Sequence, residues 1–214
     1  MPVNTAPPCP AALIRPATPA DADTLMALVL LVDLHRPAEE TTAVHAEMHR
    51  AFTTDIPGGP LSQGLNHALI AESPDGTPLG AVCCGPAHWN QDNPQIPRGL
   101  RGPVMRRIST VHTLAVFPEH RGSGIARALL HRAEHDFRTA GFAALTLRHD
   151  RSLESFYRRL GYTSAPRLTL ELPGTLGLVT QINRGWRHAI KPIANNAALR
   201  LVHGNPVLTG VLPD

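Results

Sequence analysis

Residues 114–126 read Leu-Ala-Val-Phe-Pro-Glu-His-Arg-Gly-Ser-Gly-Ile-Ala, and they are the most informative part of the chain. The apolar run over 108–116 predicts a strand, and apolar residues spaced by four over 125–140 predict an amphipathic helix that ends at Gly141. A glycine-containing loop joins the two directly. Backbone N–H groups in such a loop and in the first helical turn have no intrahelical acceptors, so the segment predicts an anion site with the spacing of a pyrophosphate cradle.

The predicted cradle combines small residues, arginines and the start of the helix: Arg121, Gly122, Ser123, Gly124, Ile125, Ala126 and Arg127. Gly122 and Gly124 present no Cβ to an approaching phosphate. The segment is not a P-loop, because no Gly-Lys-Ser/Thr follows it, and it lacks the Gly-x-Gly-x-x-Gly dinucleotide fingerprint. An ordinary tight turn between strand and helix is the alternative interpretation.

Periodicity and turn residues predict alternating strands and helices on both sides of this segment. The predicted strands cover 13–15, 67–72, 78–84, 142–147 and 168–172. The predicted helices are one that Thr18 opens and Pro37 stops, and others over 38–52, 153–160 and 182–199, the last with a break at Pro192. Residues 85–107 are predicted to be a long loop, and 202–212 a hairpin around Gly204.

Composition places the chain among globular proteins. It has 214 residues, of which 43% are hydrophobic and 17% are charged, which predicts one domain with extensions. No run approaches the ~18 apolar residues of a membrane span, and residues 1–10 lack the features of a secretory signal. We therefore expect a cytoplasmic protein with no membrane partner.

Three cysteines make neither a disulfide framework nor a spaced metal-binding set, so no metal is expected. Cys83 and Cys84 are interpreted as small buried hydrophobes. The net charge of +3 is too small to predict a nucleic-acid partner. Basic side chains exceed acidic ones only in the second half of the chain, which favours an anionic ligand there.

Two separated motifs resemble those of the GCN5-related N-acetyltransferase (GNAT) superfamily. Motif A of that family, Arg/Gln-x-x-Gly-x-Gly/Ala, is matched by Arg121, Gly124 and Ala126. The segment Phe-Tyr-Arg-Arg-Leu-Gly-Tyr over 156–162 resembles the aromatic-Tyr-x-x-x-Gly-aromatic ending of motif B.

The resemblance covers residues 12–172, which we expect to form the acetyltransferase domain. Residues 1–11 are expected to be a flexible N-terminal arm. Residues 173–214 are expected to be a C-terminal extension that completes a homodimer, covers the substrate cleft or extends the sheet.

The resemblance implies an α/β fold with a central mixed sheet that is flanked by helices and splayed between its fourth and fifth strands. Acetyl-CoA is the implied co-substrate and lies in the splay. Its pantetheine would pair with the backbone of Leu114, Ala115 and Val116, and its pyrophosphate would sit on 122–127. The implied reaction is direct acetyl transfer from the thioester to an amine, with a backbone N–H near Val116 stabilising the oxyanion.

Two residues match catalytic positions of the family. Tyr157 stands where relatives have the acid that protonates the departing thiolate; its alternative role is that of a packing aromatic. His112 lies in a His-x-Leu-Ala-Val pattern that resembles the arylalkylamine N-acetyltransferase branch, where a histidine serves the proton path. Standing two residues before Leu114, it is expected to face the same side of the strand unless a β-bulge intervenes. A histidine that only lines the cleft is the alternative.

Other residues at the site are less clearly assigned. Glu72, His149 and Asp150 are fallback bases, and a water relay to a distant acid is a further alternative. Asp150 also occupies the position where many relatives have an asparagine that contacts CoA, so an acid there departs from the family pattern.

The acceptor is expected to be the primary amine of a small molecule, held by residues 33–60 and 86–107. Carboxylates of the first segment would attract an amine, and Trp89 would stack on it or only anchor its loop. Arg98, Arg101, Arg106 and Arg107 would bind an acidic group or the CoA phosphates. The alternative functions are a protein or peptide N-acetyltransferase and a non-catalytic acyl-CoA-binding module.

Overall fold

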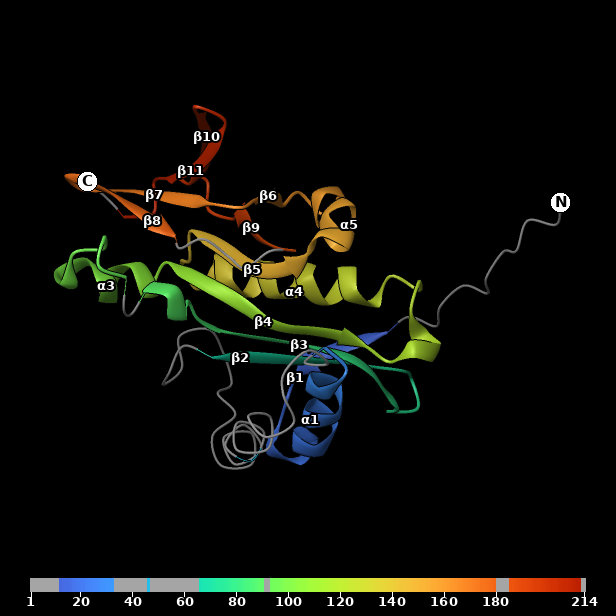
Figure 1. Cartoon of the computed structure of the whole chain (residues 1–214). Helices are drawn as coiled ribbons and strands as arrows, with labels where there is room; N and C mark the ends of the chain where they lie inside the picture. Colours follow the sequence, from blue (N-terminus) through green and yellow to red (C-terminus); the bar gives the residue numbers. More distant parts are fainter. Residues whose placement is uncertain (1–11, 33–45, 47–65, 91–92, 180–184, 213–214) are drawn as a thin grey trace, which may run out of the picture.

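The computed structural model describes residues 12–32, 46, 66–90, 93–179 and 185–212, and all statements below concern these residues. Their strands form two sheets (Figure 1). The main sheet has seven strands in the order β1-β2-β3-β4-β5-β9-β6, and the second has four in the order β10-β11-β7-β8. The parallel pairing of β4 with β5 makes the main sheet mixed, as expected.

The strands of the main sheet are β1 (Leu13–Pro16), β2 (His67–Glu72), β3 (Pro78–Pro86), β4 (Ile108–Val116), β5 (Ala144–Asp150), β9 (Trp186–Pro192) and β6 (Thr163–Ala165). The second sheet comprises β10 (Ala198–Val202), β11 (Asn205–Thr209), β7 (Leu168–Leu172) and β8 (Thr175–Val179). The α-helices are α1 (Ala22–Leu30), α3 (Arg98–Met105), α4 (Ile125–Thr139) and α5 (Glu154–Arg159). Short 3-10 helices are η1 (Pro19–Asp21), η3 (His88–Asn90), η4 (Pro118–His120) and η5 (Arg151–Leu153).

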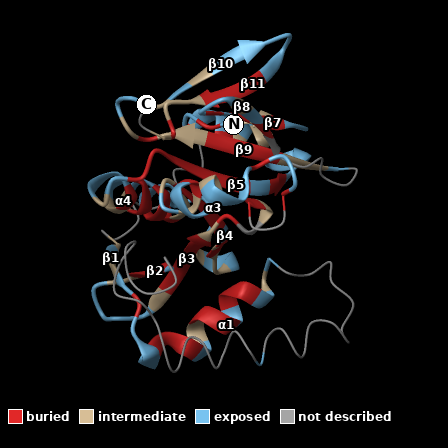
Figure 2. Cartoon of the chain, turned by 90° about the vertical axis from the view of Figure 1, so that its left-hand side faces the viewer, coloured by how far each residue is buried: buried red, intermediate tan, exposed pale blue. Residues whose placement is uncertain are grey.

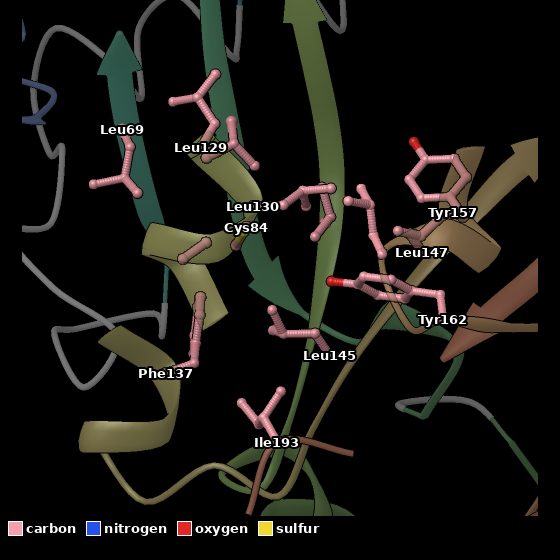
Figure 3. Close-up of a cluster of buried hydrophobic side chains, with 14 of the residues drawn as sticks. Leu69, Cys84, Leu129, Leu130, Phe137, Leu145, Leu147, Tyr157, Tyr162 and Ile193 are labelled. Atoms are coloured by element: carbon pink, nitrogen blue, oxygen red, sulfur yellow. The ribbon is translucent and has the colours of Figure 1, made fainter. Parts of the chain in front are cut away.

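The central strands are buried on both faces of the sheet, because α4 packs against one face and α1 packs against the other. Successive residues of β2 point to opposite faces of the sheet, so that Leu69 and Ile70 belong to different apolar clusters. Leu69 packs in the cluster that contains Leu129 and Leu130 of α4, and Ile70 packs in the one that contains Leu28 of α1. Figure 2 shows buried residues along β3, β5 and β9 and on α1. The α4 cluster extends to Tyr157 of α5 and to Tyr162, which directly precedes β6 (Figure 3).

The α4 helix matches its sequence pattern. Ile125, Leu129, Ala133 and Phe137 are all buried against the sheet, and Gly141 follows the helix end with φ of +87°. Beyond that turn, Phe142 packs edge-to-face on Phe137 at a centroid distance of 4.8 Å. The predicted strand and helix on either side of the cradle are therefore confirmed.

Two predictions of local structure are wrong. The predicted loop over 85–107 contains η3 and the helix α3, which begins after Pro97 although its sequence includes two glycines and Pro103. The helix predicted over 182–199 is replaced in its described part by β9 and β10. The strand conformation of β9 is set by pairing with β5 on one side and β6 on the other, which are contacts that local periodicity does not contain.

The insertion of β9 changes the expected organisation of the chain. It lies between β5 and β6, so residues 12–172 do not complete the main sheet. Of the three roles considered for residues 173–214, extension of the sheet is the one that the strand order supports. The predicted hairpin is present as β10 and β11, with its turn at His203 and Gly204, where both φ values are positive.

Other expectations meet the structure only in part. Cys83 and Cys84 are buried with free thiols, as interpreted, and burial raises the pKa of Cys83 to about 12. The N-terminal arm over 1–11 and the helix predicted over 38–52 lie outside the described residues. None of the helices that the structure describes has the length and apolarity of a membrane span.

Candidate active site

The sheet opens between β4 and β5. The two strands pair in parallel from Ile108 with Ala144 up to Val111 with Leu147, and the pairing ends there. Both strands continue, β4 to Val116 and β5 to Asp150, without pairing to each other. The splay predicted from the family resemblance is therefore present, and its narrow end lies at Val111 and Leu147.

A β-bulge lies at the start of the splay. In the antiparallel pairing with β3, Cys84 opposes Val111 but Cys83 opposes Thr113, so His112 is an extra residue without a counterpart. Such a bulge redirects the side chains around it. The structure thereby places His112 at the first position of β4 beyond its last pair with β5.

The bulge turns His112 away from the α4 face. Cys84 packs in the α4 cluster, so a Cβ built on the next residue, Gly85, would point to the opposite face of the sheet. That Cβ would lie 3.1 Å from His112 Nε2, which places His112 on the same face. Leu114 packs against the α4 cluster itself. His112 and Leu114 therefore do not share a face: the bulge is the exception to the expected alternation, because the extra residue breaks it.

Asn66 lies beside His112 and was missed in the sequence. The same Cβ on Gly85 would lie 2.5 Å from Asn66 Oδ1, so a glycine is what lets both side chains converge over β3. Both Asn66 and His112 are exposed. Their proximity depends on the pairing of β2, β3 and β4, which no local motif reveals.

The residues predicted to pair with pantetheine lie on the open edge of β4. Leu114 and Val116 face the α4 cluster and Ala115 faces the α1 cluster. On the β5 side, none of the described strands pairs with this part of β4. The backbone of Leu114–Val116 is thus available to an extended ligand that adds to the edge.

The predicted cradle follows directly from β4. After η4, Gly122 and Gly124 have φ of +80° and +90°, and Cβ atoms built on them would meet no atom within 4 Å. The first hydrogen bond of α4 runs from Ala128 N to Gly124 O, which leaves the N–H groups of 125–127 without intrahelical acceptors. Arg127 is exposed beside them. The arrangement suits an anion.

Arg121 and Ser123 also stabilise the loop itself. Arg121 Nε donates to Val116 O at 3.2 Å, across the cradle, and Ser123 Oγ donates to His120 O. Both residues are exposed. Both side chains therefore help to fix the shape of the cradle.

Tyr157 lies in α5 at the far side of the splay. Its ring is buried between Phe156, His149 and Tyr162, at centroid distances of 5.0, 5.0 and 6.0 Å. Burial raises the pKa of Tyr157 to about 12. Its hydroxyl points away from Tyr162 (Figure 3). With its pKa raised, the phenol is a neutral hydrogen-bond donor near pH 7.

The fallback bases are engaged elsewhere. Glu72 accepts from Arg15 Nε at 2.7 Å. His149 is buried, with Nδ1 2.7 Å from Asp150 O and Nε2 2.8 Å from Ser164 Oγ. Asp150 accepts from Ser152 N at 2.8 Å and caps η5. Each of the three fallback bases thus has a hydrogen-bond partner among the described residues.

Most candidate acceptor residues that the structure describes have structural roles. Trp89 packs against the cluster that contains Ile96. Arg101 donates to Ile96 O and Asn93 O, and Arg107 donates to Val211 O. The acidic residues of the first candidate segment lie outside the described residues. Among those that are described, no three His, Cys, Asp or Glu side chains gather as metal ligands would.

Two further residues at the splay were missed in the sequence, Arg148 and Trp186. Arg148 is the first residue of β5 beyond its last pair with β4, and it is exposed. Its Cζ lies 5.7 Å from the ring centroid of Trp186 in β9. The prediction of a helix over 182–199 hid this contact, because it removed β9 from the sheet.

Comparison with known proteins agrees with this geometry. The sequence model of the acetyltransferase (GNAT) domain matches residues 65–164, which include the splay, the cradle and Tyr157. None of the curated proteins matches the sequence.

Solved structures share the fold. The GNAT family N-acetyltransferase YhbS from Escherichia coli, in complex with CoA, aligns with a TM-score of 0.56 and 22% identity over 97% of this chain and 93% of that one. A phosphinothricin acetyltransferase from Sinorhizobium meliloti, in complex with AcCoA, aligns with a TM-score of 0.58 and 19% identity over 86% and 89%. The motifs, the splayed sheet and the domain match thus agree that residues 65–164 carry an acetyltransferase (GNAT) domain.

Proposed function

We propose that this chain is an acetyl-CoA-dependent N-acetyltransferase that moves an acetyl group to the primary amine of a small molecule. The observation that carries the proposal is the parting of β4 and β5, with the cradle at the end of β4 and Tyr157 on the side of β5. The relatives YhbS and phosphinothricin acetyltransferase, solved with CoA and AcCoA, support this choice of co-substrate.

The cradle and the open edge of β4 would hold the co-substrate. The N–H groups of 122–127 would bind the pyrophosphate, aided by the positive end of the α4 dipole and by Arg127. The backbone of Leu114–Val116 would pair with the pantetheine amides. When bound, acetyl-CoA supplies a thioester carbon that an amine attacks.

The side chains at the splay would manage the protons. His112 accepts the proton that a protonated amine loses before it attacks. The new N–C bond forms as the C–S bond breaks, and Tyr157 donates its proton to the departing sulfur. With a pKa of about 12, the phenol is protonated at neutral pH and regains its proton from water.

A thiol-release assay with acetyl-CoA and a panel of amines tests this function. The panel comprises arylalkylamines, polyamines, aminoglycosides, amino acids and short peptides, and a thermal shift with CoA is measured beside it. Release with a small amine supports the proposal, and release with peptides alone assigns a protein acceptor. Stabilisation by CoA without release from any amine favours an acyl-CoA-binding module, and no stabilisation contradicts the cradle assignment.

The acid role of Tyr157 gives a first prediction. Tyr157→Phe removes the donor but keeps the ring, so we expect kcat to fall by about 100-fold or more. The Kd for CoA, measured by calorimetry, should be unchanged. Tyr162→Phe is the matched control, because it removes the hydroxyl of a neighbouring buried tyrosine to which no catalytic role is assigned, and it should retain kcat. Full activity of Tyr157→Phe would assign the acid elsewhere.

A further inference from the structure

Arg148 and His112 occupy equivalent positions at the narrow end of the splay. The register of β4 with β5 runs from Ile108 and Ala144 to Val111 and Leu147, so the next residues in sequence are His112 and Arg148. Both are exposed. Paired strands lie about 4.8 Å apart, and these two strands part from that spacing onward. The two side chains therefore stand on opposite sides of the opening at its narrow end.

Both side chains also face the same side of the sheet. Leu147 packs in the α4 cluster, so Arg148 points to the other face, together with Thr146. Thr146 Oγ1 lies 2.8 Å from Thr110 Oγ1, and Thr110 is directly opposite Gly85 in β3. His112 lies over Gly85 on that face. An acceptor that approaches His112 from this face consequently meets Arg148.

The guanidinium of Arg148 contacts an aromatic ring and forms no ion pair with the described residues. Trp186, whose Cα partner is Asp150, supports it from β9 at 5.7 Å, a cation–π contact that restricts its orientation. In the part of the chain that the structure describes, no carboxylate forms an ion pair with it. Asp150, the acid on the same face, is engaged in capping η5 through Ser152 N.

We propose that Arg148 binds a carboxylate of the acceptor, so that the preferred substrate is an amino acid or a similarly small amine that carries a carboxylate. This inference rests on the proposed function, in which His112 receives the proton of the amine. A guanidinium binds a carboxylate through two parallel hydrogen bonds, which fixes orientation as well as position. Arg148 of β5 would bind the carboxylate of the acceptor, and His112 of β4 would receive the proton of its amine. These two groups of the acceptor are therefore only a few bonds apart. The same positive charge disfavours polyamines and aminoglycosides.

Matched acceptors test the proposal directly. Phenylalanine, methionine, glutamine and serine are each compared with their C-terminal amides in the thiol-release assay. The α-amine of an amide loses its proton more readily, so chemistry alone would favour the amide. We expect kcat/KM to be at least 10-fold higher for the acid of the preferred pair. Equal or higher values for all the amides would overturn the proposal.

Variants assign the effect to one side chain. Arg148→Gln should raise KM for the preferred amino acid by 10- to 100-fold while leaving KM for its amide and for acetyl-CoA unchanged. Arg148→Lys should retain part of the preference, because it keeps the charge without the fork. Arg167→Gln, which removes another exposed arginine, should have no effect. If Arg148→Gln weakens acid and amide equally, the residue has a structural role and the proposal is wrong.

A binding measurement separates this proposal from the proposed function. The N-acetylated amino acids are titrated calorimetrically into the wild-type protein and Arg148→Gln, each saturated with CoA. Saturable binding that the variant loses supports the carboxylate site, whatever the thiol-release assay shows. Failure to release thiol with any amine would count against the proposed catalysis and not against this site. Absent binding, or equal binding to both proteins, would overturn the carboxylate site whether or not the enzyme turns over.

Discussion

At the scale of single residues, the site depends on a glycine that performs no chemistry. Gly85 of β3 lies next to the β-bulge at His112. A Cβ on Gly85 would lie 2.5 Å from Asn66 Oδ1 and 3.1 Å from His112 Nε2. Both atoms are at the ends of exposed side chains, which can move aside. The glycine therefore matters for where His112 lies more than for whether the chain folds.

Gly85→Ala should consequently separate activity from stability. We expect kcat/KM to fall by about 10-fold or more, because displacing a catalytic group by an ångström is costly. The free energy of unfolding should change by less than about 1 kcal/mol, because alanine also restricts the unfolded chain. Urea denaturation and steady-state kinetics measure the two effects. Gly99→Ala, whose added Cβ meets no atom within 4 Å, is the control, and a similar loss of activity there would refute the explanation.

At the scale of elements, the start of α1 is fixed to the sheet by one carboxylate. Asp21 accepts from Arg15 Nη1 at 2.8 Å and Nη2 at 2.9 Å, and from Thr18 N at 2.7 Å. Arg15 also donates to Glu72 of β2. The hydrogen bonds from Arg15 are the main reason that the pKa of Asp21 falls to about 2. Arg15 thus links the carboxylate at the start of α1 to both β1 and β2.

This link predicts a pH-dependent stability. A carboxyl group with a lowered pKa stabilises the fold above its unfolded pKa, near 3.9, and loses that contribution as the pH falls toward 2. Asp21→Asn should therefore lower the free energy of unfolding by about 2 kcal/mol at pH 7, and by progressively less between pH 4 and pH 2. Urea denaturation across this range measures the difference. Glu119→Gln, at an exposed acid of η4, should show no such trend, and a pH-independent deficit in Asp21→Asn would contradict the pKa argument.

Elements whose signals are local were predictable, and those set by pairing were not. The strand, loop and helix around Gly124 follow from residues close in sequence, which is why the cradle could be predicted. The face of His112 could not, because the bulge appears only when β4 pairs with β3. The position of Arg148 at the splay could not be predicted for the same reason. It depends on the register of β5 with β4 and on the pairing of β5 with β9, a strand that comes about 40 residues later.

At the scale of the whole molecule, the C-terminal segment is part of the enzyme's core. Lys191 of β9, the single lysine of the chain, places its Nζ 2.6 Å from Glu134 Oε2 in the middle of α4. It also lies 5.5 Å from the ring of Tyr162. Glu134 is buried under the sheet, and its ion-pair partner lies far away in the sequence.

A buried ion pair of this kind gives a prediction for the complete chain. Lys191→Met should lower the free energy of unfolding by about 3 kcal/mol or more, because it leaves the Glu134 carboxylate buried without its partner. The double variant Glu134→Leu with Lys191→Met should recover most of this loss, since apolar side chains of similar volume replace the pair without an uncompensated charge. Urea denaturation of the two single variants and the double variant measures the coupling. If the double variant loses the sum of the two single losses, the pair does not hold β9 against α4. If it recovers, the last strand of the main sheet is joined to the helix that carries the cradle, and residues after 172 are needed for the acetyltransferase fold.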